Sequence, residues 1–96
     1  GLVAQDKLYR QDPDVVCRRV ATEIFLVPIR QNVREVGLFT MNEVAAFVWD
    51  RLDGRHTLED LVSAVVEEFD VAADTARRDI DTLLAKLFKI GSIREN

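Results

Sequence analysis

Residues 38–54 read LFTMNEVAAFVWDRLDG, and this stretch changes from a strand-like to a helix-like pattern. The extended run ends at Asn42, whose side-chain oxygen suits an N-cap, and Glu43 then lies near the positive end of a helix. From Asn42 onward the apolar residues recur about every 3.6 positions. The stretch therefore predicts a short strand, then a helix, then a left-handed stop at Gly54.

Two more helices are predicted downstream. Thr57–Asp60 has the form of a capping box, with aspartate in place of the usual glutamate. The apolar stripe that follows has helical spacing and consists of Leu58, Leu61, Val62, Val65, Val66 and Phe69. The next helix is expected after Asp70–Ala72, and its stripe is Ala76, Ile80, Leu83, Leu84, Leu87 and Phe88. We expect Gly91 to end this helix and Ser92–Arg94 to add an extended segment.

Upstream of residue 38 the pattern is typical of strands. β-Branched and aromatic residues dominate Val15–Val20 and Glu23–Val27, which predicts two neighbouring strands. Pro28 cannot donate a backbone hydrogen bond and is expected to mark the end of the second strand. Val36–Thr40 predicts a third short strand, and Gly37 within it indicates a bulge or the close approach of another backbone.

The turn signal at Asp12–Asp14 predicts a domain boundary. We expect residues 1–14 to form a flexible N-terminal segment and residues 15–96 to form the folded domain. Three strands followed by three helices predict an α+β fold, a winged helix-turn-helix-like arrangement with a three-stranded antiparallel sheet. The expected core residues are Phe47, Leu61, Val65, Ile80, Leu84 and Leu87.

Composition narrows the class of protein. With 96 residues, of which 48% are hydrophobic, the chain suits a single domain with one modest core. A net charge of −4 argues against a protein that neutralises phosphates or binds anionic membranes. The longest nearly uninterrupted apolar run, Ile24–Ile29, is too short to span a bilayer. No signal-peptide pattern and a single cysteine, Cys17, favour a cytoplasmic protein.

Few residues suggest catalysis. His56 is the only histidine and is expected in a polar loop, without other metal ligands at a suitable spacing. Cys17 is expected to be a buried or half-buried structural thiol. The carboxylates of the second helix lie outside its apolar stripe and predict a solvated face; they are Glu59, Asp60, Glu67 and Glu68. The four glycines stand singly, so no phosphate loop is indicated. The sequence predicts no enzyme, no metal and no cofactor.

A winged helix-turn-helix also suggests a DNA-binding regulator, in which the third helix enters the major groove. Arg77 and Arg78 lie near the start of this helix, but acidic residues surround them. The spacings Asp74 to Arg78 and Arg77 to Asp81 predict ion pairs within the helix. Recognition of a peptide is favoured instead: Val36–Thr40, as an outer strand, would accept an extended peptide beside the third helix.

Short motifs strengthen the peptide interpretation. The pair Met41-Asn42 after a strand, the aromatic helix segment Phe47–Trp49, the stop Leu52–Gly54 and the cap Thr57–Asp60 resemble the PqqD-like family. The resemblance covers Val15–Ile93. It implies a winged helix-turn-helix-like domain that binds the leader of a ribosomally made precursor peptide and presents it to a modifying enzyme, often a radical SAM protein.

By this resemblance the predicted peptide site consists of Val36, Gly37, Leu38, Phe39, Thr40, Arg77, Arg78, Asp81 and Leu84. Phe39 and Leu84 are equally consistent with a place in the core. An adaptor outside peptide maturation stays open as an alternative function. The exposed edge strand would also pair with its own copy, so a homodimer is open as well. The motifs do not distinguish pyrroloquinoline quinone from another peptide-derived product.

Overall fold

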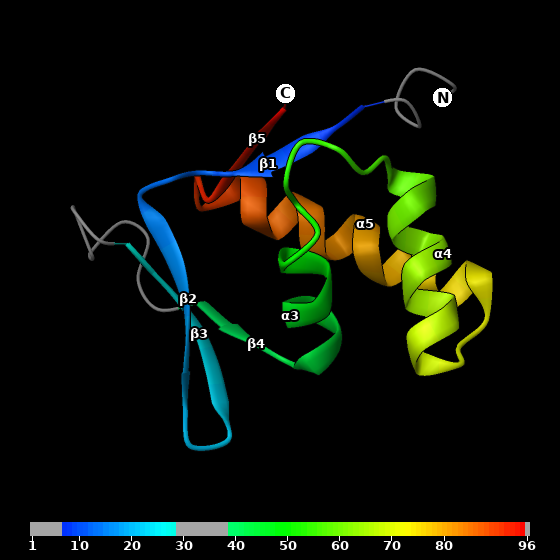
Figure 1. Ribbon diagram of the computed structural model, residues 1–96, viewed down its shortest axis with the longest axis horizontal. Coiled ribbons are helices and arrows are strands. Elements are labelled where there is room, and N and C mark those ends of the chain that lie inside the picture. Colours follow the sequence, from blue (N-terminus) through cyan, green and yellow to red (C-terminus); the bar gives the residue numbers. More distant parts are fainter. Residues whose placement is uncertain (1–6, 29–38, 96) are drawn as a thin grey trace.

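The computed structural model describes residues 7–28 and 39–95. Within them the chain forms two small sheets and three helices (Figure 1). In chain order the elements are β1 (Tyr9–Gln11), β2 (Val15–Val20), β3 (Glu23–Pro28), β4 (Phe39–Met41), α3 (Glu43–Trp49), α4 (Leu58–Phe69), α5 (Ala73–Lys89) and β5 (Ile93–Glu95). This confirms the predicted α+β fold, in which a three-stranded antiparallel sheet precedes three helices.

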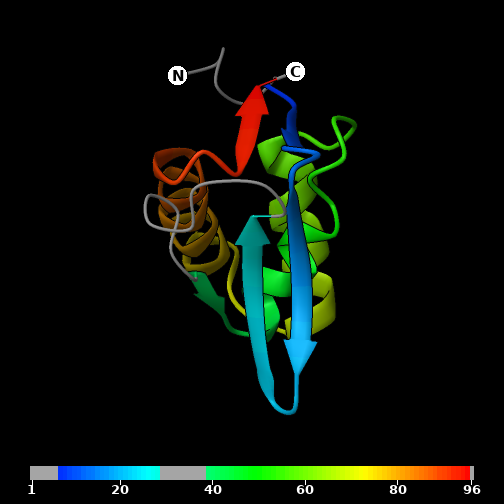
Figure 2. The same ribbon diagram turned by 90° about the vertical axis from the view of Figure 1, so that its left-hand side faces the viewer.

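The main sheet has the strand order β2-β3-β4, and both pairings are antiparallel. β2 and β3 form a hairpin whose turn extends past the helices (Figures 1 and 2). Ala21 makes this tight turn with a positive φ of 55°. Ile24, Leu26 and Met41 are buried, and they share one face of the sheet because side chains alternate along a strand. That face packs against the helices and forms part of the core.

Side-chain caps fix where two of the helices begin. The Asn42 side chain accepts a hydrogen bond from the Ala45 amide at 2.8 Å, as predicted. At α4 both halves of the predicted capping box are present, since the Asp60 amide donates to Thr57 and the Thr57 amide donates to Asp60. Each cap satisfies amides that the first helical turn leaves unpaired. The helix starts were therefore readable from the sequence.

The end of α3 differs from the prediction. The helix ends at Trp49 rather than at Gly54, and the amides of Arg51 and Leu52 then donate to carbonyls three residues earlier. The chain thus tightens into 3₁₀-like turns, which are common at helix ends. Gly54 does have a positive φ of 83°, but its amide donates to the Tyr9 carbonyl at 2.8 Å. Gly54 therefore positions the loop against β1.

A second, two-stranded sheet joins the two ends of the described chain. β1 pairs with β5 in antiparallel register, Tyr9 opposite Glu95 and Gln11 opposite Ile93. β5 confirms the expected extended segment near Ser92–Arg94, whereas β1 was not predicted. It lies inside the segment 1–14, so regular structure begins before residue 15. The Gln11 amide also donates to the Leu52 carbonyl at 2.9 Å, which fastens β1 to the loop after α3.

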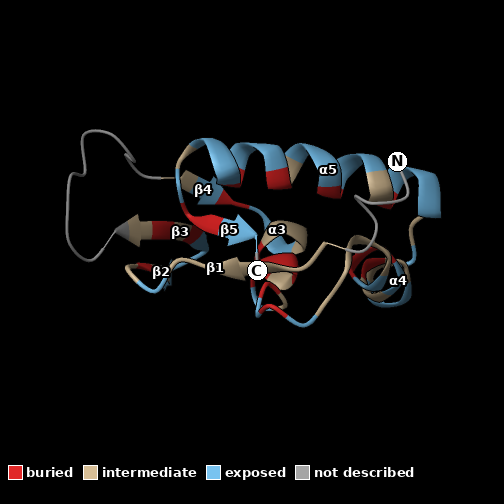
Figure 3. Cartoon of the chain, turned by 90° about the horizontal axis from the view of Figure 1, so that it is seen from above, coloured by how far each residue is buried: buried red, intermediate tan, exposed pale blue. Residues whose placement is uncertain are grey.

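The core lies between the main sheet and the helices, whose buried sides face inward in Figure 3. All the expected core residues are buried except Phe47, which is half-buried. The rings of Phe47 and Phe69 pack edge to face, with their centroids 5.2 Å apart. Phe88, expected in the stripe of α5, is 40% exposed and packs its ring against Tyr9 of β1. Across residues 7–28 and 39–95, no helix is long and apolar enough to cross a membrane.

Candidate functional site

A groove of about 390 Å³ lies between β4, the start of α3 and one side of α5. We call it the β4–α5 groove. Its apolar lining residues are Phe39, Met41, Val44, Ala45, Val48, Ile80 and Leu83, and its polar ones are Thr40, Asn42, Arg78, Asp79, Thr82 and Lys86. An apolar floor with polar groups at its margins is typical of a site that binds a partly apolar chain.

One wall of the groove is a sheet edge. β4 is the last strand in the order β2-β3-β4, and within the described residues it pairs with β3 alone. Along it, Phe39 is half-buried, Thr40 is exposed and Met41 is buried. Among residues 7–28 and 39–95, no strand pairs with the side of β4 away from β3, so the described fold leaves this side as a sheet edge. This wall can therefore bind backbone as well as side chains.

The other wall is one side of α5. Arg78, Thr82 and Lys86 follow each other at intervals of four, and Asp79 and Leu83 flank them, so all five lie on neighbouring parts of the helix surface. Leu83 is half-buried and the other four are exposed. Arg78, Asp79 and Lys86 form no ion pair within the part of the chain that the structure describes. This wall therefore offers one apolar contact, Leu83, with charged side chains on either side of it along the helix.

Arg77 contacts α4 and does not line the groove. Its guanidinium makes a two-pronged contact with the Glu59 carboxylate of α4, with Nη2 2.8 Å from Oε1. The hydrogen bond from Arg77 holds the pKa of the Glu59 carboxyl below its ordinary value. The predicted pair of Arg77 with Asp81 is thus replaced by a link between two helices. The contact fixes α4 to α5 on the side away from the groove.

The predicted site residues therefore separate into three groups. Phe39, Thr40 and Arg78 line the groove. Arg77, Asp81 and Leu84 do not, and Leu84 is in the core at 6% exposure. Val36, Gly37 and Leu38 lie outside the described residues. The other lining residues were not predicted; they are Met41, Asn42, Val44, Ala45, Val48, Asp79, Ile80, Thr82, Leu83 and Lys86.

The orientation of α5 about its axis explains why its groove-lining residues were not predicted. The buried stripe Ala76, Ile80, Leu84 and Leu87 faces the core, so the groove has to use one flank of that stripe. One flank carries Arg77 and the other carries Asp79 and Lys86. The sequence contains the phase of the helix, but it does not say which flank meets β4. The Arg77–Glu59 contact assigns the first flank to α4.

The remaining reactive side chains have ordinary surroundings. Cys17 is exposed, contrary to the expected buried thiol, and partial burial followed by the Asp50 carboxylate raises its pKa. A raised thiol pKa leaves less thiolate at neutral pH. His56 lies in a loop, as expected, and its hydrogen bond to Asp53 lowers the pKa of that carboxyl. Within the described residues, no three His, Cys, Asp or Glu side chains are grouped to hold a metal ion.

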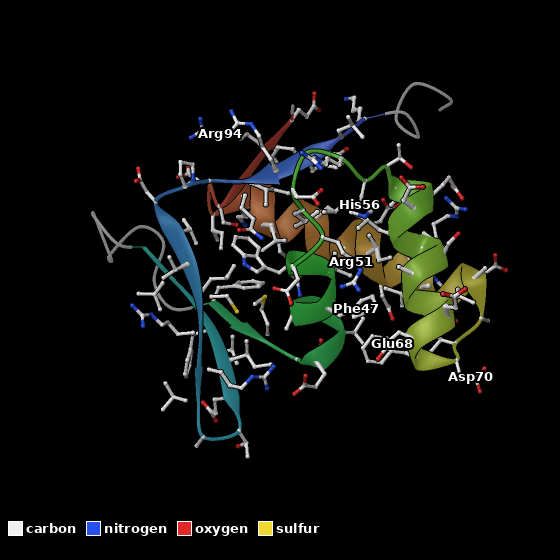
Figure 4. The ribbon with its side chains drawn as sticks, in the orientation of Figure 1. Phe47, Arg51, His56, Glu68, Asp70 and Arg94 are labelled. Atoms are coloured by element: carbon white, nitrogen blue, oxygen red, sulfur yellow. The ribbon has the colours of Figure 1, made fainter. Side chains whose placement is uncertain are left out.

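A second surface lies between α3 and α4 (Figure 4). Arg51 places its guanidinium carbon 3.5 Å from the centroid of the Phe47 ring and donates to the Phe47 carbonyl. Glu68 lines a shallow hollow there, together with Phe47. The other charged residues that line this hollow are Arg19, Glu43 and Asp50, and Arg19 of β2 is its lining residue from a described strand. The contacts account for the half-exposed ring of Phe47.

Comparisons with known proteins agree with the geometry. The family model described as coenzyme PQQ synthesis protein D (PqqD) matches residues 23–93. A structure of lasso peptide synthetase B1 complexed with the leader peptide is similar at 23% identity with a TM-score of 0.72, covering 90% of this chain and 96% of that one. A structure of TbiB1 in complex with the TbiA(beta) leader peptide is similar at 21% identity with a TM-score of 0.70, covering 88% of this chain and 94% of that one. No curated protein sequence matches. The two structural likenesses support the fold.

Proposed function

The chain belongs to the family of coenzyme PQQ synthesis protein D (PqqD), and from this membership and the β4–α5 groove we propose that it is a non-catalytic peptide-recognition protein. It binds the leader of a ribosomally made precursor peptide and presents the remainder to a modifying enzyme. The observation that carries the proposal is the outer edge of β4, which no other strand of the described residues pairs with, beside an apolar groove. Both structural neighbours were determined with a leader peptide, which supports the same role.

The leader would bind by strand addition. An extended peptide placed along β4 exchanges backbone hydrogen bonds with it and directs alternate side chains toward α5. β4 has only three residues, so few backbone hydrogen bonds are available. Apolar contacts with Phe39, Val44 and Leu83 must then contribute much of the affinity. Backbone pairing provides a general attraction, and the lining side chains provide selectivity.

The partner enzyme and the compartment complete the proposal. We propose a modifying enzyme of the radical SAM type and a cytoplasmic location, both on the resemblance to PqqD-like proteins. The protein itself supplies no catalytic group in this scheme. It raises the effective concentration of the precursor near the enzyme by holding the leader. The groove requires only an extended leader, so the scheme is the same for pyrroloquinoline quinone and for another peptide product.

An N-methyl scan of the peptide tests strand addition directly. The probes are synthetic candidate leaders, taken from any short precursor genes found near this one, methylated at one backbone nitrogen at a time and titrated by calorimetry. Only every second amide of an added strand faces β4, so affinity should fall at alternate positions, by about tenfold for each lost hydrogen bond. Equal effects at all positions, or none, would contradict strand addition.

Amide NMR locates the binding surface. Addition of the same leader should shift signals of β4 and of the groove side of α5. A DNA duplex is the control for the regulator alternative and should leave α5 unchanged, since Asp79 and Asp81 oppose phosphate there. Peptide-induced shifts confined to β2 or α4 would place the site elsewhere and refute the proposed groove.

A further inference from the structure

The charges of the β4–α5 groove suggest which peptides it selects. Resting on the proposed function, we propose that the groove prefers a peptide with an acidic side chain two positions from an apolar one. The apolar side chain packs on Leu83, and the acidic side chain meets the Lys86 ammonium. Both residues line the groove, and the motif gives the bound strand its register.

The spacing follows from the geometry of a helix beside a strand. Leu83 and Lys86 are three residues apart, which is about 4.5 Å along a helix axis. Side chains on one face of a strand are two residues apart, or about 6.7 Å. The four-carbon stem of lysine covers the difference of about 2 Å. A spacing of four residues in the peptide would overshoot Lys86 by more than the stem provides.

Lys86 is free to bind an acidic group. It forms no hydrogen bond or ion pair through its side chain among the described residues, and the next lining residue on its side of the helix, Thr82, is neutral. Lys86 is exposed, so its ammonium is open to a side chain of a bound peptide. A carboxylate is therefore the peptide group that gains most at this position.

The opposite end of the groove is balanced. Arg78 and Asp79 are adjacent and carry opposite charges, and both line the groove. A second acidic side chain there is attracted by Arg78 and repelled by Asp79, so the two effects offset each other. The groove thus selects one acidic residue rather than two. Removing the Asp79 charge should create a second acidic subsite next to Arg78.

Selection from a peptide library tests the motif. Displayed nine-residue random peptides are selected on the intact protein and on Lys86→Glu, with Lys89→Glu as the matched control. Lys89 lies in the same last turn of α5 and undergoes the same charge change, but it does not line the groove. Wild-type protein and the control should enrich an apolar residue and an acidic residue two positions apart. Lys86→Glu should lose the acidic residue and enrich a basic one.

Titration then measures the preference. A selected peptide and its glutamate-to-glutamine form should differ about threefold in affinity for the wild type, in line with an exposed ion pair. The difference should vanish on Lys86→Glu and shrink in 1 M salt, where charges are screened within about 3 Å. On Asp79→Asn, a further acidic residue placed toward Arg78 should raise affinity about threefold, whereas it leaves the wild type unchanged.

Two failures are distinguishable by NMR. Selected peptides that shift β4 and α5 signals without any acidic preference would overturn the motif and leave the proposed function intact. Selected peptides that never shift β4 would overturn the proposed groove and the motif together. A preference that survives in Lys86→Glu would move the acidic subsite to another cation and refute the role of Lys86.

Discussion

The main sheet has two edges, and they differ in what lies beside them. β2 is the longer edge, with six residues, and its Cys17, Arg18, Arg19 and Val20 are exposed. β4 has three residues but adjoins the groove formed with α5. Both edges offer backbone hydrogen bonds, but the β2 edge adjoins the shallow hollow at Arg19, whereas β4 forms one wall of the β4–α5 groove. A free edge is therefore insufficient for a peptide site, because the adjacent helix supplies the discrimination.

The β2 edge is also protected against pairing with a strand of another molecule. Arg18 and Arg19 lie in the middle of the strand, and charged side chains on an edge discourage pairing with another strand. Arg19 is held by Glu43 at the start of α3, with Nη1 3.0 Å from Oε2. Antiparallel pairing of β2 with its own copy would bring these arginines close to each other. We therefore propose that any homodimer avoids this edge.

The largest expected effect concerns α5, which makes the β4 edge different from the β2 edge. Leu84 is fully within the core, so Leu84→Ala should lower the free energy of unfolding by about 2–5 kcal/mol. The neighbouring Leu83→Ala, at a half-buried position in the groove, should cost about 1 kcal/mol or less while weakening peptide binding. Urea unfolding and calorimetric titration measure the two quantities. Equal losses of stability would show that Leu83 is also a core residue.

Proline on each edge compares the two strands directly. Thr40→Pro removes a backbone donor from β4 and stiffens the edge, so peptide affinity should fall about tenfold or more. Cys17→Pro makes the matching change on β2, because Cys17 and Thr40 both lie in pairs whose backbone groups point away from β3, and it should leave peptide affinity within about twofold. Circular dichroism checks that the helices remain in both variants. Similar losses from both substitutions would mean that the peptide does not distinguish the edges.

The sequence predicted best where local chemistry decides the structure. Asn42 and the Thr57–Asp60 capping box fix helix starts through contacts within one turn, and the β2–β3 hairpin joins adjacent strands. β1 was missed because three residues show no period, and its partner β5 lies at the other end of the chain. Helix α3 ended early because contacts with β1, rather than Gly54 alone, shape the loop after it.

The candidate site depended on contacts that no local pattern contains. Phe39, Thr40 and Arg78 were predicted, but the choice between the two flanks of α5 required knowing that Arg77 pairs with Glu59. Cys17 shows the same limit. It shares the inward face of β2 with Val15, yet it is exposed because it lies on the sheet edge. The alternation of side chains along a strand predicts which face of the sheet a residue occupies, whereas its burial depends on the elements packed against that face.

Self-association tests the protected edge. Arg18→Val removes one charge and raises strand propensity on β2, so it should increase dimer formation a few-fold, because unfavourable like-charge contacts between paired strands are small. Sedimentation at several protein concentrations measures the dimer. Lys89→Val, which removes a charge from an exposed position on α5, is the control and should not change association. An unchanged dimer fraction in Arg18→Val would contradict protection by this arginine.

The smallest expected effect is the acid sensitivity of the contact that holds α5 against α4. The hydrogen bond from Arg77 lowers the pKa of Glu59 in the folded state below the ordinary 4.5. A carboxyl with a lowered folded pKa stabilises the fold above its unfolded pKa, and this contribution is lost as the pH falls through the folded value. Glu59→Gln should therefore be less stable than wild type at pH 6, and the difference should diminish below about pH 4.5.

The control is Glu67→Gln, an exposed position on the same helix that forms no ion pair within the described residues. At pH 6, Glu67→Gln should lose less stability than Glu59→Gln. The comparison of the two variants then separates the Arg77–Glu59 contact from the general loss of a negative charge. Because Glu59 is solvent-accessible, salt should weaken the effect. A Glu59→Gln difference that stays constant from pH 6 to pH 3 would mean that packing, rather than the ion pair, holds this flank of α5. The groove flank would then owe its position to the core stripe alone.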